Sequence, residues 1–216
     1  ETAMKCWLSE GTNIEALDFF GRTALMRAAM GNQVDAMKLL MAEGANIETV
    51  DSQHRMTALM QAAEWGSEAG TKFLLAQGAN IKATDDDGQT ALMVAASIGH
   101  ASVVKLLLGS SANGADDVDP KLRTPLHLAA RRGDYETTKV LVEAAPDQRF
   151  AKDASSQTPR DVAIAAGSFG VLSLLPRESF AEACSNLVGR WETKVVLIGC
   201  IAACVLAMWG RSASAS

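Results

Sequence analysis

Apolar positions in this chain recur in blocks about 34 residues long. Each block opens with a threonine and a short run rich in leucine, methionine and alanine, and a second apolar run follows after a polar break. The opening threonines are Thr23, Thr57, Thr90, Thr124 and Thr158, separated by 34, 33, 34 and 34 residues. A constant period of this length is typical of a stacked array and not of one globular core. The pattern predicts two short helices in each repeat.

Residues that favour helix ends stand at fixed places in each block. Threonine followed by Ala or Pro favours a helix start, because the hydroxyl can cap free N–H groups and proline suits the first turn. The predicted left-handed stops, nine residues later, are Asn32, Gly66, Gly99, Gly133 and Gly167. The predicted second helices carry the apolar runs Met37–Leu40, Phe73–Leu75, Val104–Leu108 and Val140–Val142. An aspartate precedes each next threonine by five residues, or by six in the second copy: Asp18, Asp51, Asp85, Asp119 and Asp153.

The five copies resemble the ankyrin repeat. They read TALMRAA, TALMQAA, TALMVAA, TPLHLAA and TPRDVA from their threonines, and the resemblance covers about Cys6 to Leu175. It implies an all-α ankyrin-repeat solenoid, in which helix pairs stack and the connecting segments project as β-hairpin fingers. Such arrays present an extended concave surface suited to binding proteins. The resemblance therefore implies a protein-binding scaffold.

Three departures from the family pattern carry structural expectations. Three copies have Met where the family usually has a buried His, which favours flexible apolar packing in place of polar contacts. Leu122 and Ser156 stand where the finger usually has Gly, so we expect those two turns to be distorted. The last copy has Arg160 and Asp161 at positions that are usually apolar or His. These residues favour a terminal repeat with a polar outer face.

A second feature lies near the C-terminus. Val195 to Trp209 is 15 residues long and carries no charge, which is shorter than the roughly 20 residues that a membrane span needs. Trp191 and Trp209 lie 18 residues apart, about 27 Å along a helix, and tryptophans are typical of membrane interfaces. Arg190, Lys194 and Arg211 can reach outward to headgroups. We predict a transmembrane helix over 194–211, with a buried helix that packs on the repeats as the alternative.

Small residues mark one face of this predicted span. Gly199, Ala203 and Ala207 recur every four residues, a spacing that allows close contact with other transmembrane helices. The alternative is that these residues face lipid. The preceding segment, 176–193, has an apolar stripe after Ser179 and Glu182. It fits a helix that covers the end of the repeats, or an amphipathic helix that rests on the membrane surface.

The chain therefore divides into five predicted parts. Residues 1–22 form a partial N-terminal repeat, 23–175 the ankyrin repeats, 176–193 a linker with a short capping or interfacial helix, 194–211 the transmembrane helix and 212–216 a polar tail. The chain begins at Glu1 and not Met. We expect upstream sequence, with any targeting segment, to have been removed.

Charge and composition narrow the function. Lys194 and Arg211 are the charged residues of 194–216. The rest of the chain therefore carries 18 of the 20 basic residues and all 25 acidic residues, a net charge of −7. This sign disfavours nucleic acid as a partner. The four cysteines form neither a zinc spacing nor a disulfide framework, which favours a reducing compartment for the repeats. We find no catalytic, metal-binding or cofactor-binding motif and predict a protein that is not an enzyme.

Aligning the copies selects candidate partner-binding residues. The positions seven and eight residues after the threonine face the concave groove in the family, which singles out Met30, Glu64, Trp65, Ile98, Arg131 and Arg132. Aromatic and Arg residues dominate binding hot spots. The alternative for Trp65 is packing between inner helices. Secondary candidates in the fingers are Phe19, Phe20, His54, Arg55 and Arg123.

Two classes of function fit these features. The first is a structural or assembly subunit of a membrane complex, whose span packs on other transmembrane helices in the lipid bilayer while the repeats hold a protein partner. The second is a tail-anchored adaptor that recruits a soluble signalling or targeting partner. The short span with basic flanks favours a plastid or mitochondrial membrane over the endoplasmic reticulum.

Overall fold

The computed structural model describes residues 13–110 and 114–175, all within one compact unit that ends at Pro176. The first helices of the five repeats are α2 (Ala24–Met30), α4 (Ala58–Glu64), α6 (Ala91–Ile98), α8 (Pro125–Arg132) and α10 (Pro159–Ala165). The second helices are α3 (Val34–Ala42), α5 (Glu68–Ala76), α7 (Ala101–Ser110) and α9 (Tyr135–Ala144). Short 3-10 turns are η1 (Gly114–Asp116), η2 (Pro146–Phe150) and η3 (Phe169–Val171), and η3 takes the place of the second helix in the fifth repeat.

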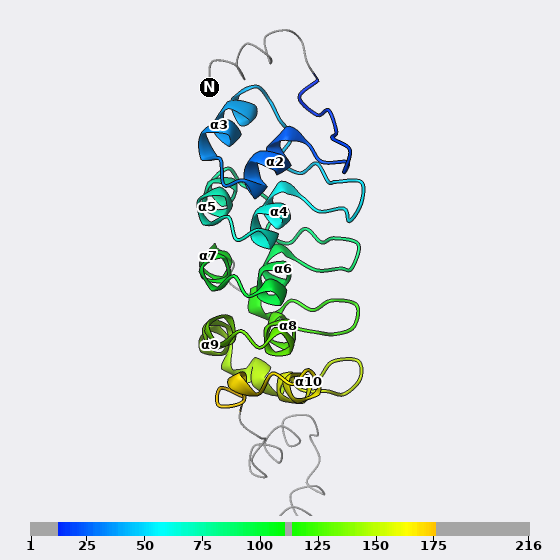
Figure 1. The fold of residues 1–216 in the computed structure, drawn as a ribbon, viewed down its shortest axis with the longest axis vertical. Coiled ribbons are helices and arrows are strands. Elements are labelled where there is room, and N and C mark those ends of the chain that lie inside the picture. The colour runs from blue at the N-terminus through cyan, green and yellow to red at the C-terminus, as the bar shows by residue number, and fades with distance from the viewer. Residues whose placement is uncertain (1–12, 111–113, 176–216) are drawn as a thin grey trace, which may run out of the picture. The chain divides into compact units, whose positions relative to one another are not determined.

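The helices stack in two layers that follow the order of the sequence (Figure 1). Each first helix packs on the first helix of the next repeat, from α2 through to α10, and α3, α5, α7 and α9 form the second layer. The paired alanines of the first four copies are buried, as are Leu59, Leu92 and Leu126. Small alanine side chains let the backbones approach closely, and the leucines fill the space between layers. This arrangement confirms the predicted array of helix pairs.

Side chains that bond to backbone carbonyls tie three pairs of neighbouring repeats together. The residue ten positions after a threonine reaches the carbonyl seven positions after the preceding threonine. The pairs are Ser67 Oγ with the Met30 carbonyl, His100 Nε2 with the Glu64 carbonyl and Ser168 Oγ with the Arg131 carbonyl, at 2.9, 2.9 and 3.0 Å. These bonds satisfy carbonyls at the helix C-termini that lack partners within their own helices. They also hold the ends of the first helices in a fixed register along the stack.

The predicted helix stops have the predicted conformation. Asn32, Gly66, Gly99, Gly133 and Gly167 all have positive φ, between 54° and 98°. The threonine hydroxyls of Thr23, Thr57 and Thr158 accept from the amide three residues later, as expected for a cap. At Thr90 the hydroxyl makes no cap hydrogen bond.

The connecting segments form tight turns, which we call the fingers (18–22, 51–56, 85–89, 119–123 and 153–157). Their first and last residues are joined by a backbone hydrogen bond, such as Asp119 N to the Arg123 carbonyl at 3.1 Å. The described residues contain no β-strand, and an isolated bridge between Val50 and Thr57 is their one β-type pair. The expectation of β-hairpin fingers was therefore wrong: each turn is too short to extend a ladder beyond its closing bond. In each finger the aspartate carboxylate accepts backbone N–H groups of its own turn, so this residue is structural.

Leu122 and Ser156 do not distort their fingers, contrary to the sequence-based expectation. Their φ values are 56° and 61°, close to the 70° of Gly21 and Gly88 at the same place in other fingers. The hydrogen bonds around the aspartate over-determine this conformation, so a residue with a side chain adopts it at a local cost. Leu122 is 52% exposed, so its side chain meets no wall that would forbid the turn.

One of the three methionines that replace His, Met26, keeps part of its polar contact. In the fourth repeat the Thr124 N–H donates to Nδ1 of His127 at 3.1 Å, and Nε2 lies 3.1 Å from the Gln157 carbonyl. In the first repeat the Thr23 N–H points instead at the sulfur of Met26, 3.5 Å away. Sulfur is a weak acceptor. The methionine therefore exchanges most, though not all, of the polar contact for packing.

We expect His127 to make stability fall in mild acid. Burial lowers the pKa of His127, and its Nδ1 must stay unprotonated to accept from Thr124. Below about pH 6.5, the ordinary imidazole value, the unfolded chain takes up the proton first, so the free energy of unfolding decreases as the pH falls. His127→Met, which copies Met60 at the same position, should remove this part of the pH dependence. Urea unfolding at pH 7.5 and 5.5 measures it, and equal pH slopes in both proteins would contradict the assignment.

The polar residues of the last repeat have structural roles. The Arg160 guanidinium donates to the carbonyls of Leu172 and Leu175, which ties the end of the described chain to α10. Asp161 takes the place of the histidine, and its carboxylate accepts from the Thr158 N–H at 3.0 Å and from the Thr158 hydroxyl at 2.7 Å. These hydrogen bonds hold the pKa of Asp161 below its ordinary value. The polar residues of the terminal repeat thus form hydrogen bonds that hold its end in place, in addition to giving it a polar surface.

The predicted membrane segment lies outside the described residues. This applies to Arg190, Trp191, Lys194, Trp209 and Arg211, to Gly199, Ala203 and Ala207, and to the linker 176–193. Across 13–110 and 114–175, every helix is too short or too polar to cross a bilayer.

Candidate protein-binding groove

The C-terminal ends of the first helices form one line along the stack. Met30 ends α2, Glu64 ends α4, Ile98 ends α6, and Arg131 and Arg132 end α8. Met30, Glu64 and Ile98 are half-buried, while both arginines are exposed. We call this line of residues, together with the fingers beside it, the groove. The interrepeat bonds to the Met30, Glu64 and Arg131 carbonyls fix the backbone from which these side chains project.

Trp65 is a large exposed side chain on the helix side of the groove. It caps α4, and 58% of it is exposed. The alternative that it packs between inner helices therefore does not describe its place in the fold. An indole with this exposure leaves a large apolar surface in water, which is a feature of interaction sites.

Arg131 and Arg132 give the groove a basic end. Neither guanidinium makes an ion pair with any residue in the described part of the chain. Cations in the last turn of a helix are stabilised by the helix dipole, which accounts for their presence without a partner. Their positive charge is nevertheless free to meet a carboxylate of another molecule.

A cavity of about 190 Å³ opens between the fingers and helices α4 and α6. It brings the groove residues Glu64 and Ile98 together with the third finger and the end of the second. Its lining consists of His54, Met56, Glu64, Asp85, Asp86, Asp87, Gln89, Val94, Ser97 and Ile98. We call this space the groove cavity.

Four carboxylates surround the groove cavity. Asp85 accepts the Gln89 N–H at 2.8 Å. Burial raises the pKa of Asp85, and the neighbouring charges of Asp87 and Asp86 raise it further, against hydrogen bonds that lower it. Asp86 lies 3.6 Å from Arg55 in an exposed ion pair. The cavity therefore has a negative potential that one nearby cation only partly offsets.

A comparison with protein families identifies this architecture. A family model described as ankyrin repeats (3 copies) matches residues 1–85, 70–153 and 92–184, which together cover most of the chain. The chain belongs to the ankyrin-repeat family. No curated protein matches the sequence. Ankyrin repeats act as protein-interaction scaffolds and are typically not enzymes, so the general function of this domain is protein binding.

The secondary finger candidates of this ankyrin domain have unequal roles. Phe19 is 95% exposed and meets Phe20 edge to face, with ring centroids 5.6 Å apart. Arg123 is bound by the buried carboxylate of Asp119, so its charge is already used inside its own finger. Of the two arginines among these candidates, Arg55 is therefore the more available to a partner.

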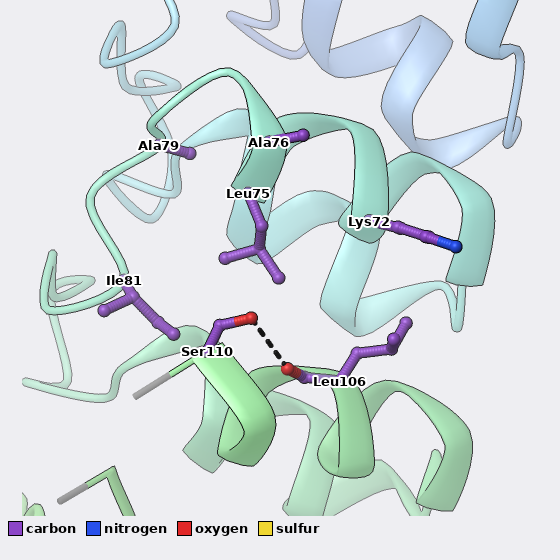
Figure 2. Close-up of a pocket in the computed structure, with 7 residues that line it drawn as sticks. All are labelled: Lys72, Leu75, Ala76, Ala79, Ile81, Leu106 and Ser110. Atoms are coloured by element: carbon purple, nitrogen blue, oxygen red, sulfur yellow. Dashed lines mark hydrogen bonds between the residues drawn. The ribbon is translucent and has the colours of Figure 1, made fainter. Parts of the chain in front are cut away.

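A larger cavity, about 420 Å³, lies on the other layer of the ankyrin stack (Figure 2). It opens between α5, α7 and the loop after α5, and its lining is Lys72, Leu75, Ala76, Ala79, Ile81, Leu106 and Ser110. The Ser110 hydroxyl donates to the Leu106 carbonyl at 3.0 Å, so the polar group at its edge is already paired (Figure 2). The walls are mainly aliphatic, and they share no residue with the groove.

Alignment of the copies did not reveal the groove cavity. Asp85, Asp86 and Asp87 of the third finger line this cavity together with Glu64 of α4. The position of a finger beside the helix ends of its own repeat and of the preceding repeat is the feature that could have indicated this cavity. Within the described residues, no cluster of three His, Cys, Asp or Glu side chains could hold a metal ion.

Proposed function

We propose that this ankyrin domain holds a protein partner in the groove, through Trp65, Ile98 and Met30 as an apolar contact and through Glu64, Arg131 and Arg132 as charged contacts. The observation that carries the proposal is the 58% exposure of Trp65 on the same line as two exposed arginines that form no ion pair within the described residues. Trp and Arg are the residues most enriched at binding hot spots. A fixed backbone register also lowers the entropy that binding costs, because the contact residues are already ordered.

We further propose that the chain is anchored in a membrane by residues 194–211 and serves as a subunit of a larger membrane complex. The support is the uncharged run Val195–Trp209 with tryptophans and basic residues at its flanks. The Gly199, Ala203 and Ala207 face would pack on another transmembrane helix. Anchoring would make the groove contact effectively intramolecular and so strengthen it. The proposed site is an organellar membrane, plastid or mitochondrial, with the repeats in a reducing compartment.

Replacing Trp65 by alanine should weaken the partner complex by about 2 kcal/mol, or roughly 30-fold. The melting temperature should change little, because the indole is mostly outside the core. Tyr135→Ala is the matched control: it removes an aromatic ring that is 46% exposed at the start of the outer helix α9. The measurement is retention of the partner on a native gel, after extraction in mild detergent. Equal retention of both variants would place the contact outside the groove.

Deleting residues 194–216 should move the protein from the membrane fraction to the soluble fraction after alkaline extraction. The ankyrin core should remain folded, because the described repeats close on themselves through the Arg160 bonds to Leu172 and Leu175. Circular dichroism checks the fold of the truncated protein. If the full chain is itself soluble and the truncated chain aggregates, the segment is a core helix and the anchor is rejected. If the full chain purifies with mobile, salt-sensitive partners and no fixed subunits, the adaptor function replaces the subunit function.

A further inference from the structure

The groove cavity combines an apolar floor with an acidic rim. Met56, Val94 and Ile98 supply aliphatic surface, and Glu64, Asp86 and Asp87 supply carboxylates. A cavity of roughly 150 Å³ can hold a benzene molecule, so about 190 Å³ has room for one long side chain. The cavity is therefore sized for a single residue of a partner and not for a whole helix.

The charges around the cavity are not balanced. Arg55 offsets Asp86, and the Asp85 carboxylate is occupied by backbone N–H groups of its finger. Glu64 and Asp87 form no ion pair with any residue of the described ranges. Two carboxylates that line the cavity, one from α4 and one from the finger, thus remain to meet a cation.

We propose that the groove cavity receives a lysine or arginine side chain of the protein partner. This inference rests on the proposed function and names the chemistry of the partner at that site. The methylene stem packs on Met56, Val94 and Ile98, as long basic side chains do along apolar surfaces. The cationic head lies between Glu64 and Asp87.

The remainder of the groove gives the partner a direction. The acidic cavity lies at the second and third repeats, and the basic pair Arg131 and Arg132 lies at the end of α8 in the fourth. Neighbouring packed helices lie about 8–10 Å apart. Consider a partner segment that has acidic residues on one side of its cavity-bound basic residue and basic residues on the other. In one orientation its acidic residues lie near Arg131 and Arg132, and in the reverse orientation its basic residues lie there and are repelled. Complementary charges of this kind set register and exclude wrong partners.

A random 12-residue peptide library displayed on phage, panned on the full-length protein in mild detergent, provides the probe. Peptides whose binding is lost in Trp65→Ala are synthesised with a fluorophore and measured by fluorescence polarisation. We expect these groove binders to share a Lys or Arg at one position. Replacing that residue by Gln should weaken binding to the unchanged protein about tenfold, and the loss should lessen at high salt, because the rim is exposed to solvent.

Two variants isolate the cavity charges. The double variant Glu64→Gln, Asp87→Asn keeps the side-chain shapes and should bind the basic peptide about tenfold more weakly, with no further loss when the peptide carries Gln. Glu143→Gln, on the exposed part of α9, is the matched control and should bind normally. Glu64→Lys should restore binding to a peptide with Glu at the selected position. Melting curves verify that each variant is folded.

The outcomes separate this inference from the function on which it rests. Groove binders that depend on Trp65 but share no basic position, or that bind the double variant and the unchanged protein equally, overturn the cavity assignment and the Glu64 contact. They leave standing the proposal that the groove holds a partner through Trp65. A library that yields no Trp65-dependent binder overturns both. An equal loss in Glu143→Gln would show a nonspecific effect of net charge and would also reject the assignment.

Discussion

Replacing Leu92 by alanine is expected to lower the free energy of unfolding by about 2–5 kcal/mol, the range for buried Leu→Ala changes. Leu92 is the second residue of α6, in the middle of the stack, and is 2% exposed. Its neighbours α4 and α8 hold the helix from both sides, so the cavity left by the missing atoms cannot collapse easily. Urea unfolding monitored by circular dichroism measures the loss. Leu59→Ala and Leu126→Ala should behave alike, since both are buried at the same repeat position.

The equivalent position in the fifth repeat provides the comparison. Arg160 stands there, in the terminal repeat. Arg160→Ala should lower the free energy of unfolding, because it would leave the carbonyls of Leu172 and Leu175 without their donor. The loss should still be smaller than for Leu92→Ala, since Arg160 is only half-buried and water can replace its hydrogen bonds. Equal losses at Leu92 and Arg160 would contradict the view that the fifth repeat ends the cooperative core.

The repeat architecture was predictable because the same local solution recurs five times. A threonine that can cap, two alanines that permit close packing and a left-handed glycine or asparagine fit only one arrangement of helix pairs. Local rules of this kind do not depend on distant residues. The positive φ at Asn32 shows this well, since the helix stop survives the change from glycine.

Contacts between repeats were less predictable. Glu64 and the Asp85–Asp87 turn line one cavity because a finger packs beside the helix of the preceding repeat, and no periodicity encodes that placement. The undistorted turn at Leu122 is similar: its conformation is imposed by the Asp119 carboxylate and not by the residue that adopts it. At the groove cavity and at the Leu122 turn alike, the conformation depends on contacts between residues that, considered singly, are typical of a solvated loop.

Removing the carboxylate of Asp119 should lower the free energy of unfolding by about 3 kcal/mol. The group is buried and accepts the Lys121 and Arg123 N–H groups, at 2.9 and 2.8 Å, and the Arg123 guanidinium. Burial works against its ionised form, but Arg123 outweighs burial and the pKa of Asp119 lies below its ordinary value. Asp119→Ala leaves a partly buried guanidinium and two amides without their acceptor, and an uncompensated buried charge is strongly destabilising.

Asp18→Ala is the matched control for Asp119→Ala, because both aspartates open a finger. Asp18 accepts the Phe20 and Arg22 N–H groups in the same way, at 2.8 and 2.9 Å. Its ion pair with Arg27 is longer, 3.8 Å, and exposed, so such a pair contributes about 0–1 kcal/mol. The control should therefore cost about 1 kcal/mol, and parallel urea titrations of the two variants give the difference. The pKa of Asp119 is lowered by folding, so its contribution is present at neutral pH and is lost as the pH falls below about 4, where the unfolded chain binds the proton first. The gap between the two variants should accordingly narrow in acid; a gap that is absent at pH 7, or that persists unchanged at pH 3, would show that the Arg123 pair does not hold this finger.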